Sequence, residues 1–334
     1  MKKITLIYGG GTMGSFLACC LNRSGHTIFF LTRGKQYKKI IVNGLEVKIF
    51  NNSNLKKIYI IKSGDSFNII ENIKDIKGVK FNNIFITTSI NESLVKTFKA
   101  IEPFVNKKTL IVTPCTAIPF WWHECLKNNF KLKFKKKLEK IFAKNIKRKN
   151  LVGMTMWLSG KIEKPGKVKI SHIQRGLPIK EIYSSRKKQV DLLRNDIKKN
   201  CRSPIVINIF SEIFIKSLNS LAFNLIALKY NENNKMLSQN QEAKNDIKNI
   251  LEEGDVILKY NGIKIPQSPK SRIDQTLSSS KHTMSMLNSV NNNKKTELKA
   301  LWKSFEKISK IFNHKMSFTK KNIIIVKRKI NEYF

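Results

Sequence analysis

Apolar and polar residues follow one another in the first half of the chain in the pattern of a β/α protein. Short apolar runs that fit buried strands occur at 4–8, 26–31, 55–62, 81–89 and 110–112. Between them, segments 16–21, 36–44 and 92–104 place apolar residues at helical spacing. Strands that alternate with helices form a parallel sheet with helices on both faces. We therefore predict an N-terminal doubly wound α/β sheet of the Rossmann type.

The second half has a different pattern. Residues 153–170, "GMTMWLSGKIEKPGKVKI", carry a Lys-Pro-Gly turn between two extended runs, which is typical of a hairpin. From about residue 183 the periodicity is helical to the end. This predicts a Rossmann-like domain at 1–190 and an all-helical domain at 205–334.

A glycine cluster follows the first predicted strand. Gly9, Gly11 and Gly14 give the spacing G-x-G-x-x-G, directly before an apolar helix pattern. The first glycine permits a sharp turn, the second lets backbone N–H groups approach a pyrophosphate, and the third lets helix and strand pack closely. We expect a dinucleotide site that includes Thr12 and Met13. The alternative is a tight strand-to-helix turn without a ligand.

The end of the second predicted strand bears on the choice of dinucleotide. Sites for NAD usually carry an acid there, whereas this chain has Thr32-Arg33-Gly34-Lys35 and no acid before Glu46. Guanidinium binds phosphate in a bidentate manner, and a carboxylate repels it. Arg33 therefore predicts NADPH/NADP as the cofactor. The alternative is a solvated arginine on a lysine-rich surface.

Composition limits the cellular context. The 334 residues are 41% hydrophobic and contain five cysteines without a C-x-x-C pair. No signal-peptide apolar region and no run of 18 apolar residues is present, so we expect neither secretion nor a membrane span. Five cysteines without metal spacing fit reduced thiols and indicate a cytoplasmic protein. The histidines lack metal-ligand spacing, so we expect no metal.

The net charge of +41 raises the question of a polyanionic partner. The lysines are spread along the whole chain, so we expect no nucleic-acid partner. The densest basic stretch, 127–150, places phenylalanine and leucine every four residues, as in an amphipathic helix. A solvated surface insertion and a surface for nucleic acid or anionic lipid are both compatible with it.

A polar stripe interrupts the apolar helix pattern of residues 210–228. Lys216, Ser220 and Asn224 fall on one face at i, i+4 and i+8. A solvated face of this chain would carry several charges, whereas this one carries one lysine and short hydrogen-bonding groups. We expect it to face a small polar ligand. The alternative is the exposed side of an ordinary core helix.

A second polar group lies in 281–302, where Ser285 sits between methionines and Glu297 precedes an apolar helix pattern. A helix start at Thr296-Glu297 would also account for that acid.

In this order, the pieces resemble the ketopantoate reductase family (2-dehydropantoate 2-reductases), over roughly residues 2–327. The resemblance rests on "IYGGGTMGSFLACCLNRSGHTIFFLTRG", "TAIPFWW", "KPGKVKI", "IKSLNSLAFNLIAL" and "HTMSMLNSV…TEL". The lysine helix and the spacing from Ser285 to Glu297 are its most specific parts. The resemblance is compatible with a homodimer.

The resemblance implies that the domain at 1–190 binds NADP(H) and that the helical domain at 205–334 binds the substrate and carries the catalytic residues. It also implies roles for single residues. Lys216 matches the lysine that protonates the ketone oxygen as hydride arrives, and Glu297 matches an acid beside cofactor and substrate. Ser220, Asn224 and Ser285 match substrate-binding positions. The glycine loop, Arg33 and Thr116 match cofactor-binding positions. A positioned ammonium stabilises the developing oxygen charge and supplies the proton, so the residue types suit carbonyl reduction.

Departures from the family pattern leave the keto acid open: Thr116 and Ser220 replace asparagines, Ser89 replaces a lysine, and Ser289 replaces an aspartate. The expected reaction is NADPH-dependent reduction of a small 2-keto acid, with ketopantoate first. The alternatives are a related reductase for another ketone and a catalytically idle NADP(H)-binding protein.

Overall fold

The structure, a computed structural model, describes residues 3–51, 54–89, 94–114, 116–126, 146–277 and 282–334. The chain divides into two compact units, Met1–Cys115 with Lys136–Ile209, and Thr116–Lys135 with Phe210–Phe334. The segment 116–135 thus groups with the helical unit, although it lies within the range 1–190 that the sequence predicts for the dinucleotide-binding domain. The amphipathic helix predicted at 127–150 lies outside the described residues except for its last five.

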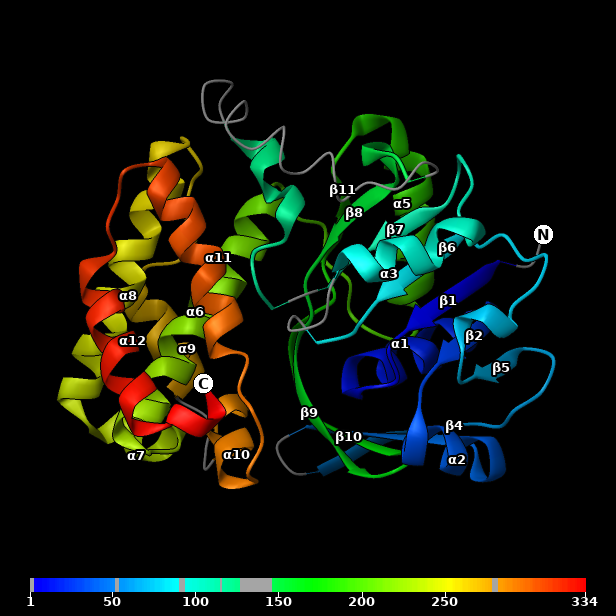
Figure 1. Cartoon of the computed structure of the whole chain (residues 1–334), viewed down its shortest axis with the longest axis horizontal. Coiled ribbons are helices and arrows are strands. Elements are labelled where there is room, and N and C mark those ends of the chain that lie inside the picture. Colours follow the sequence, from blue (N-terminus) through cyan, green and yellow to red (C-terminus); the bar gives the residue numbers. More distant parts are fainter. Residues whose placement is uncertain (1–2, 52–53, 90–93, 115, 127–145, 278–281) are drawn as a thin grey trace. The chain divides into compact units, whose positions relative to one another are not determined.

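The first unit is built on a seven-stranded sheet in the order β11-β8-β7-β6-β1-β2-β5 (Figure 1). Its strands are β1 (Ile4–Tyr8), β2 (Thr27–Leu31), β5 (Phe67–Ile70), β6 (Asn83–Ile86), β7 (Leu110–Val112), β8 (Leu151–Met154) and β11 (Ile179–Glu181). All neighbours pair in parallel except β11, which is antiparallel to β8. The predicted doubly wound parallel sheet is confirmed.

A second, four-stranded sheet has the order β4-β3-β10-β9. Its strands are β3 (Leu45–Asn51), β4 (Asn54–Ile61), β9 (Trp157–Lys164) and β10 (Lys167–Gly176). β9 and β10 form the predicted antiparallel hairpin around the Lys-Pro-Gly turn. The run 55–62 is a strand, as expected, but it pairs antiparallel with β3 and is absent from the parallel sheet. Local periodicity predicts a strand, but it does not show which of the two sheets that strand joins.

Helix α1 (Thr12–Asn22) connects the two sheets. It contacts β1 and β2 of the parallel sheet and β3, β9 and β10 of the other. Its residues from Gly14 to Leu21 are all buried, because one face packs on each sheet. In the described part of this unit, the other helices are α2 (Gly34–Asn43), α3 (Leu94–Ile101) and α5 (Lys187–Lys198). Short 3-10 turns lie at Ile73–Asp75, Glu102–Phe104, Arg148–Asn150 and Ser184–Arg186.

A buried polar cluster fixes the amino ends of β1 and β2. His26 lies between Thr5, whose Oγ1 is 2.8 Å from Nδ1, and Asp196, whose Oδ2 is 3.1 Å from Nε2. Lys3 also binds the Asp196 carboxylate. Burial lowers the pKa of His26, against the opposing effect of Asp196. The cluster joins helix α5 to the amino end of the parallel sheet, whereas the glycine loop follows the carboxyl end of β1.

The second unit is helical. Its helices are α6 (Ile209–Tyr230), α7 (Asn234–Gln239), α8 (Gln241–Tyr260), α9 (Pro269–Leu277), α10 (Ser285–Asn291), α11 (Leu298–Ile311) and α12 (Ser317–Lys329). Short 3-10 turns lie at Phe120–Cys125 and Asn331–Tyr333. The central element is α6, whose apolar residues from Ile213 to Leu228 are at most 2% exposed.

Helix α6 is long and apolar enough to cross a membrane by length and composition, but 78% of that window is buried inside the protein. Packing in the helical unit therefore accounts for its apolar character. An ion pair between Arg272 of α9 and Asp255 of α8 is also buried here, and Arg272 donates to Asn219 Oδ1 of α6 at 3.3 Å. Asn219 is therefore hydrogen-bonded to this buried ion pair.

Candidate active site

The glycine loop joins β1 to α1 at the carboxyl end of the parallel sheet. Gly9 has φ +128°, and a Cβ there would lie 2.9 Å from the backbone of Thr87, which follows β6. At Gly14 a Cβ would lie 1.9 Å from the Gly9 carbonyl oxygen. Thr87 Oγ1 donates to the same oxygen at 2.8 Å. The first and third glycines are therefore required by the packing of the protein itself.

Gly11 is different, because a Cβ there would meet no protein atom within 4 Å. Its backbone, φ −74° and ψ −172°, suits any residue. It is the N-cap of α1, whose first turn has no acidic residue and receives no side-chain cap from Gly11. The missing side chain leaves free space in front of helix N–H groups, which is what a bound pyrophosphate needs. The described loop therefore fits a dinucleotide, and Thr12 and Met13 begin the helix beside it.

The loop after β2 carries the predicted specificity residue. Arg33 is exposed and is the N-cap of α2, and Lys35 is exposed in its first turn. The carboxylate of Glu71, directly after β5, accepts a hydrogen bond from the Gly34 N–H at 2.9 Å. An acid therefore does lie beside this loop, although none follows β2 in the sequence. It is brought there by the parallel pairing of β2 with β5.

Two further residues of this region were not found from the sequence. Gln36 of α2 donates to the Gly10 carbonyl at 3.2 Å and accepts from Gly166 N–H at 2.9 Å, so it ties the glycine loop to the β9–β10 turn. Thr87 holds the loop as described above. Neither residue belongs to a local motif, since their partners are 26 to 130 positions away.

The polar stripe predicted on α6 lies in the helical unit. Lys216 and Ser220 are partly buried, and Asn224 is 4% exposed. Asn224 Nδ2 donates to the Ser220 carbonyl oxygen at 2.8 Å and to Ser220 Oγ at 3.4 Å. These contacts connect two of the three residues of the stripe along the helix.

Asn224 also joins α6 to α10. Its Oδ1 accepts hydrogen bonds from the Ser285 hydroxyl at 3.3 Å and from Met286 N–H at 2.9 Å. Ser285 is the first residue of α10 and is exposed. The structure thus brings together three predicted substrate-side residues, Ser220, Asn224 and Ser285. Both ends of the Asn224 amide are engaged within the protein, so this side chain orients Ser285.

Burial lowers the pKa of Lys216 to about 8. Desolvation disfavours the ammonium, so the lysine holds its proton less tightly than a surface lysine. A pKa near the working pH is what an amine needs in order to donate a proton and regain it in each cycle.

Glu297 is the N-cap of α11 and is partly buried, and its backbone carbonyl accepts from Leu301 N–H at 2.9 Å. The neighbouring Thr296 is buried, and its N–H donates to the Tyr333 carbonyl. The helix start considered for Thr296-Glu297 is therefore present.

Thr116 begins the segment that leads to the 3-10 turn at Phe120–Cys125 and is partly buried. The two tryptophans that follow are core residues: Trp122 Nε1 donates to the Phe210 carbonyl at 2.8 Å, and Trp121 meets the Phe210 ring edge-on at 6.0 Å. The family-like stretch "TAIPFWW" is therefore anchored to the start of α6.

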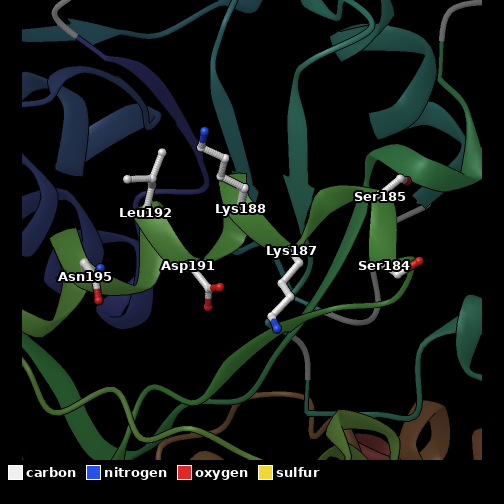
Figure 2. A pocket seen from close by; sticks show the side chains of 7 residues that line it. All are labelled: Ser184, Ser185, Lys187, Lys188, Asp191, Leu192 and Asn195. Carbon is white, nitrogen blue, oxygen red and sulfur yellow. The ribbon is translucent and has the colours of Figure 1, made fainter.

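Figure 2 shows a surface pocket of the first unit, built on α5 and the turn before it. Its residues are far from the glycine loop in the sequence. It is lined by Ser184, Ser185, Lys187, Lys188, Asp191, Leu192 and Asn195. None of the predicted site residues lines it, and its charges are mixed. Among the described residues, no group of three His, Cys, Asp or Glu could hold a metal ion.

Comparison with known proteins gives consistent matches. The model of the family "Ketopantoate reductase PanE/ApbA" matches residues 5–114, and that of its C-terminal domain matches residues 208–318. A 2-dehydropantoate 2-reductase from Mesorhizobium japonicum is 21% identical over 315 residues, which cover 92% of each chain.

Among solved structures, 2-dehydropantoate 2-reductase from Geobacter metallireducens GS-15 matches with a TM-score of 0.80 at 14% identity, covering 98% of this chain and 99% of that one. The ternary structure of D-mandelate dehydrogenase with NADH and anilino(oxo)acetate matches with a TM-score of 0.78 at 18% identity and covers 99% of both chains. At these identities the structural matches show a shared fold. Together with the family models over both halves, they lead to one conclusion: the chain belongs to the ketopantoate reductase family of oxidoreductases.

Proposed function

We propose that this protein reduces a small 2-keto acid to the 2-hydroxy acid with NADPH, and that ketopantoate, reduced to pantoate, is its substrate. The observation that carries the proposal is the polar face of α6, where Lys216 precedes Ser220 and Asn224, and Asn224 in turn holds Ser285. It is supported by the family models that match both halves of the chain. A cytoplasmic location fits the described cysteines, which form no disulfide bond with one another: Cys19, Cys20, Cys125 and Cys201.

The bound dihydronicotinamide supplies a hydride to the carbonyl carbon. Lys216 gives its proton to the carbonyl oxygen as the C=O π bond breaks, and its positive charge stabilises the oxygen while charge develops there. Ser285 donates a hydrogen bond to the substrate carboxylate, in an orientation fixed by Asn224. Glu297 helps to hold the Lys216 proton.

The cofactor is held in the first unit. The loop shaped by Gly9, Gly11 and Gly14 binds the pyrophosphate. Arg33 binds the 2′-phosphate, and Thr116 of the second unit contributes to the cofactor site.

A related reaction on another keto acid is the second candidate. Its support is the likeness to D-mandelate dehydrogenase, whose structure holds NADH and anilino(oxo)acetate, and the replacement of family residues by Thr116, Ser89, Ser220 and Ser289. Fewer amides would leave fewer donors for the hydroxyl groups of a polar substrate.

A substrate panel separates the candidates. Purified protein is assayed by NADPH oxidation with ketopantoate, 2-ketoisovalerate, pyruvate and benzoylformate. The proposal expects kcat/KM for ketopantoate to exceed that for the other acids by at least about tenfold, the scale of the net free energy of one hydrogen bond. Equal or better turnover of another acid assigns the second candidate. Cofactor binding without turnover of any acid refutes both.

A further inference from the structure

A carboxylate from a distant strand lies at the start of α2. β2 and β5 pair in parallel with Leu31 opposite Ile70, and Thr32 N–H donates to the Ile70 carbonyl at 3.0 Å. The next residue after Ile70 is Glu71, and its Oε1 accepts from Gly34 N–H at 2.9 Å. The acid therefore lies beside the loop that contains Arg33.

This carboxylate takes the place of a missing helix cap. The N-cap residue Arg33 offers no side-chain acceptor, and the first turn of α2 has no acid of its own. Helix N–H groups and the helix dipole favour a negative group at this end. A carboxylate and a phosphate oxygen compete for the same donors, so Glu71 occupies an amide that would otherwise be available to a cofactor phosphate.

The charges around the loop act in opposite directions. Arg33 and Lys35 are exposed and attract a 2′-phosphate, which carries more than one negative charge at neutral pH. The Glu71 carboxylate repels that phosphate and can accept a hydrogen bond from a free ribose hydroxyl. NADPH and NADH differ only in this phosphate, so Glu71 affects the two cofactors unequally.

We propose that Glu71 is a specificity-determining residue, which reduces the preference for NADPH that Arg33 provides and allows the protein to use NADH as well. The inference rests on the proposed cofactor site. The position is supplied by β5, whereas the acid of an NAD site ordinarily follows β2.

The test compares cofactor affinities in the intact protein. Glu71→Gln keeps an oxygen that can accept from Gly34 N–H but removes the charge. NADPH and NADH are titrated separately, and binding is followed by the change in nicotinamide fluorescence. We expect the NADPH Kd to fall about fivefold and the NADH Kd to stay within about twofold, as for one partly screened charge at this range. Glu71→Lys should move the ratio further in the same direction.

Asp75→Asn is the matched control. Asp75 is an exposed acid close to Glu71 in the sequence, and the substitution removes the same charge. Its ratio of Kd values should remain that of the unchanged protein. Equal changes for both cofactors in Glu71→Gln, or a ratio equal to that of Asp75→Asn, overturn the inference. Absence of keto-acid turnover would refute the proposed reaction, but it leaves this titration intact, so the two failures are distinguishable.

Discussion

The side-chain oxygen of Asn224 in α6 accepts hydrogen bonds from the Ser285 hydroxyl and from Met286 N–H, at 3.3 and 2.9 Å. One amide thus caps the start of α10 and aligns the serine that we assign to the substrate carboxylate. A polar residue at 4% exposure inside an apolar helix is retained because its hydrogen bonds are satisfied. The pair links the stability of α10 to the geometry of the proposed site.

We therefore expect Asn224→Ala to affect both stability and substrate binding. Loss of the cap should lower the free energy of unfolding by about 1–2 kcal/mol and raise KM for the keto acid, because Ser285 loses its orientation. Steady-state kinetics and urea denaturation measure the two effects. Asn240→Ala is the control, since Asn240 caps α8 by accepting from Ala243 N–H at 3.0 Å. It should lower stability without raising KM; a KM equal in both variants would contradict the assignment.

Lys216 gives a prediction with opposite effects on activity and stability. Lys216→Met should lower kcat by about 10²-fold or more, because the proton donor is lost. The pKa of Lys216 is lowered to about 8 by burial. The unfolded chain therefore binds more protons than the folded one between pH 8 and the ordinary lysine value, and wild-type stability rises with pH across this window. Below pH 8, Lys216→Met should melt at a higher temperature than the wild type.

Lys229, near the end of the same helix, is the contrasting position. The polar stripe does not include it, so its loss should leave kcat nearly unchanged. The structure adds that Lys229 donates to Asp246 at 2.6 Å with 20% of its side chain exposed. Lys229→Ala should therefore lower the melting temperature, opposite to Lys216→Met. If both lysine variants lose activity equally, the catalytic face is misassigned.

Two glycines of the loop are needed for different reasons, Gly11 for cofactor binding and Gly14 for packing. Gly11→Ala meets open space, so the free energy of unfolding should fall by no more than about 1 kcal/mol, the usual cost of alanine at an N-cap. NADPH should nevertheless bind at least about tenfold more weakly, because the methyl group occupies the space left for the pyrophosphate. Isothermal titration and thermal melting measure the two quantities.

Gly14→Ala, unlike Gly11→Ala, should lower stability in the same experiments. Its Cβ would lie 1.9 Å from the Gly9 carbonyl oxygen, so the loop must move, at a cost of about 1–3 kcal/mol in stability. Normal NADPH binding by Gly11→Ala would show that the cofactor does not approach this loop.

The His26 cluster predicts how stability depends on pH. The pKa of His26 is lowered by burial, so below its ordinary value of 6.5 the unfolded chain binds more protons than the folded one. Stability should therefore fall as the pH decreases from 7.5 to 5. His26→Gln should show a smaller fall over this range in urea denaturation. His172→Gln, at an exposed position, should keep the wild-type dependence; a flattened dependence there as well would exclude His26 as the cause.

The sequence by itself determined what depends on neighbouring residues. The loop from Gly9 to Gly14 can be predicted from the sequence, because a turn with positive φ and a close strand–helix contact each require glycine at a fixed offset. The parallel strands and the polar stripe of α6 are readable because the side-chain periods of strands and helices are regular. The proposed roles of Lys216 and Arg33 come from such local patterns together with the family resemblance.

The tertiary structure decided what depends on pairing between distant segments. The run 55–62 has the same alternation in either sheet, and only its pairing with β3 places it outside the parallel one. Glu71 reaches Gly34 because β5 lies next to β2, and Asn224 reaches Ser285 because α10 packs on α6. Periodicity along a chain records which face of an element is buried but not which element covers it. These partners are 37 and 61 positions apart, so only the folded chain reveals them.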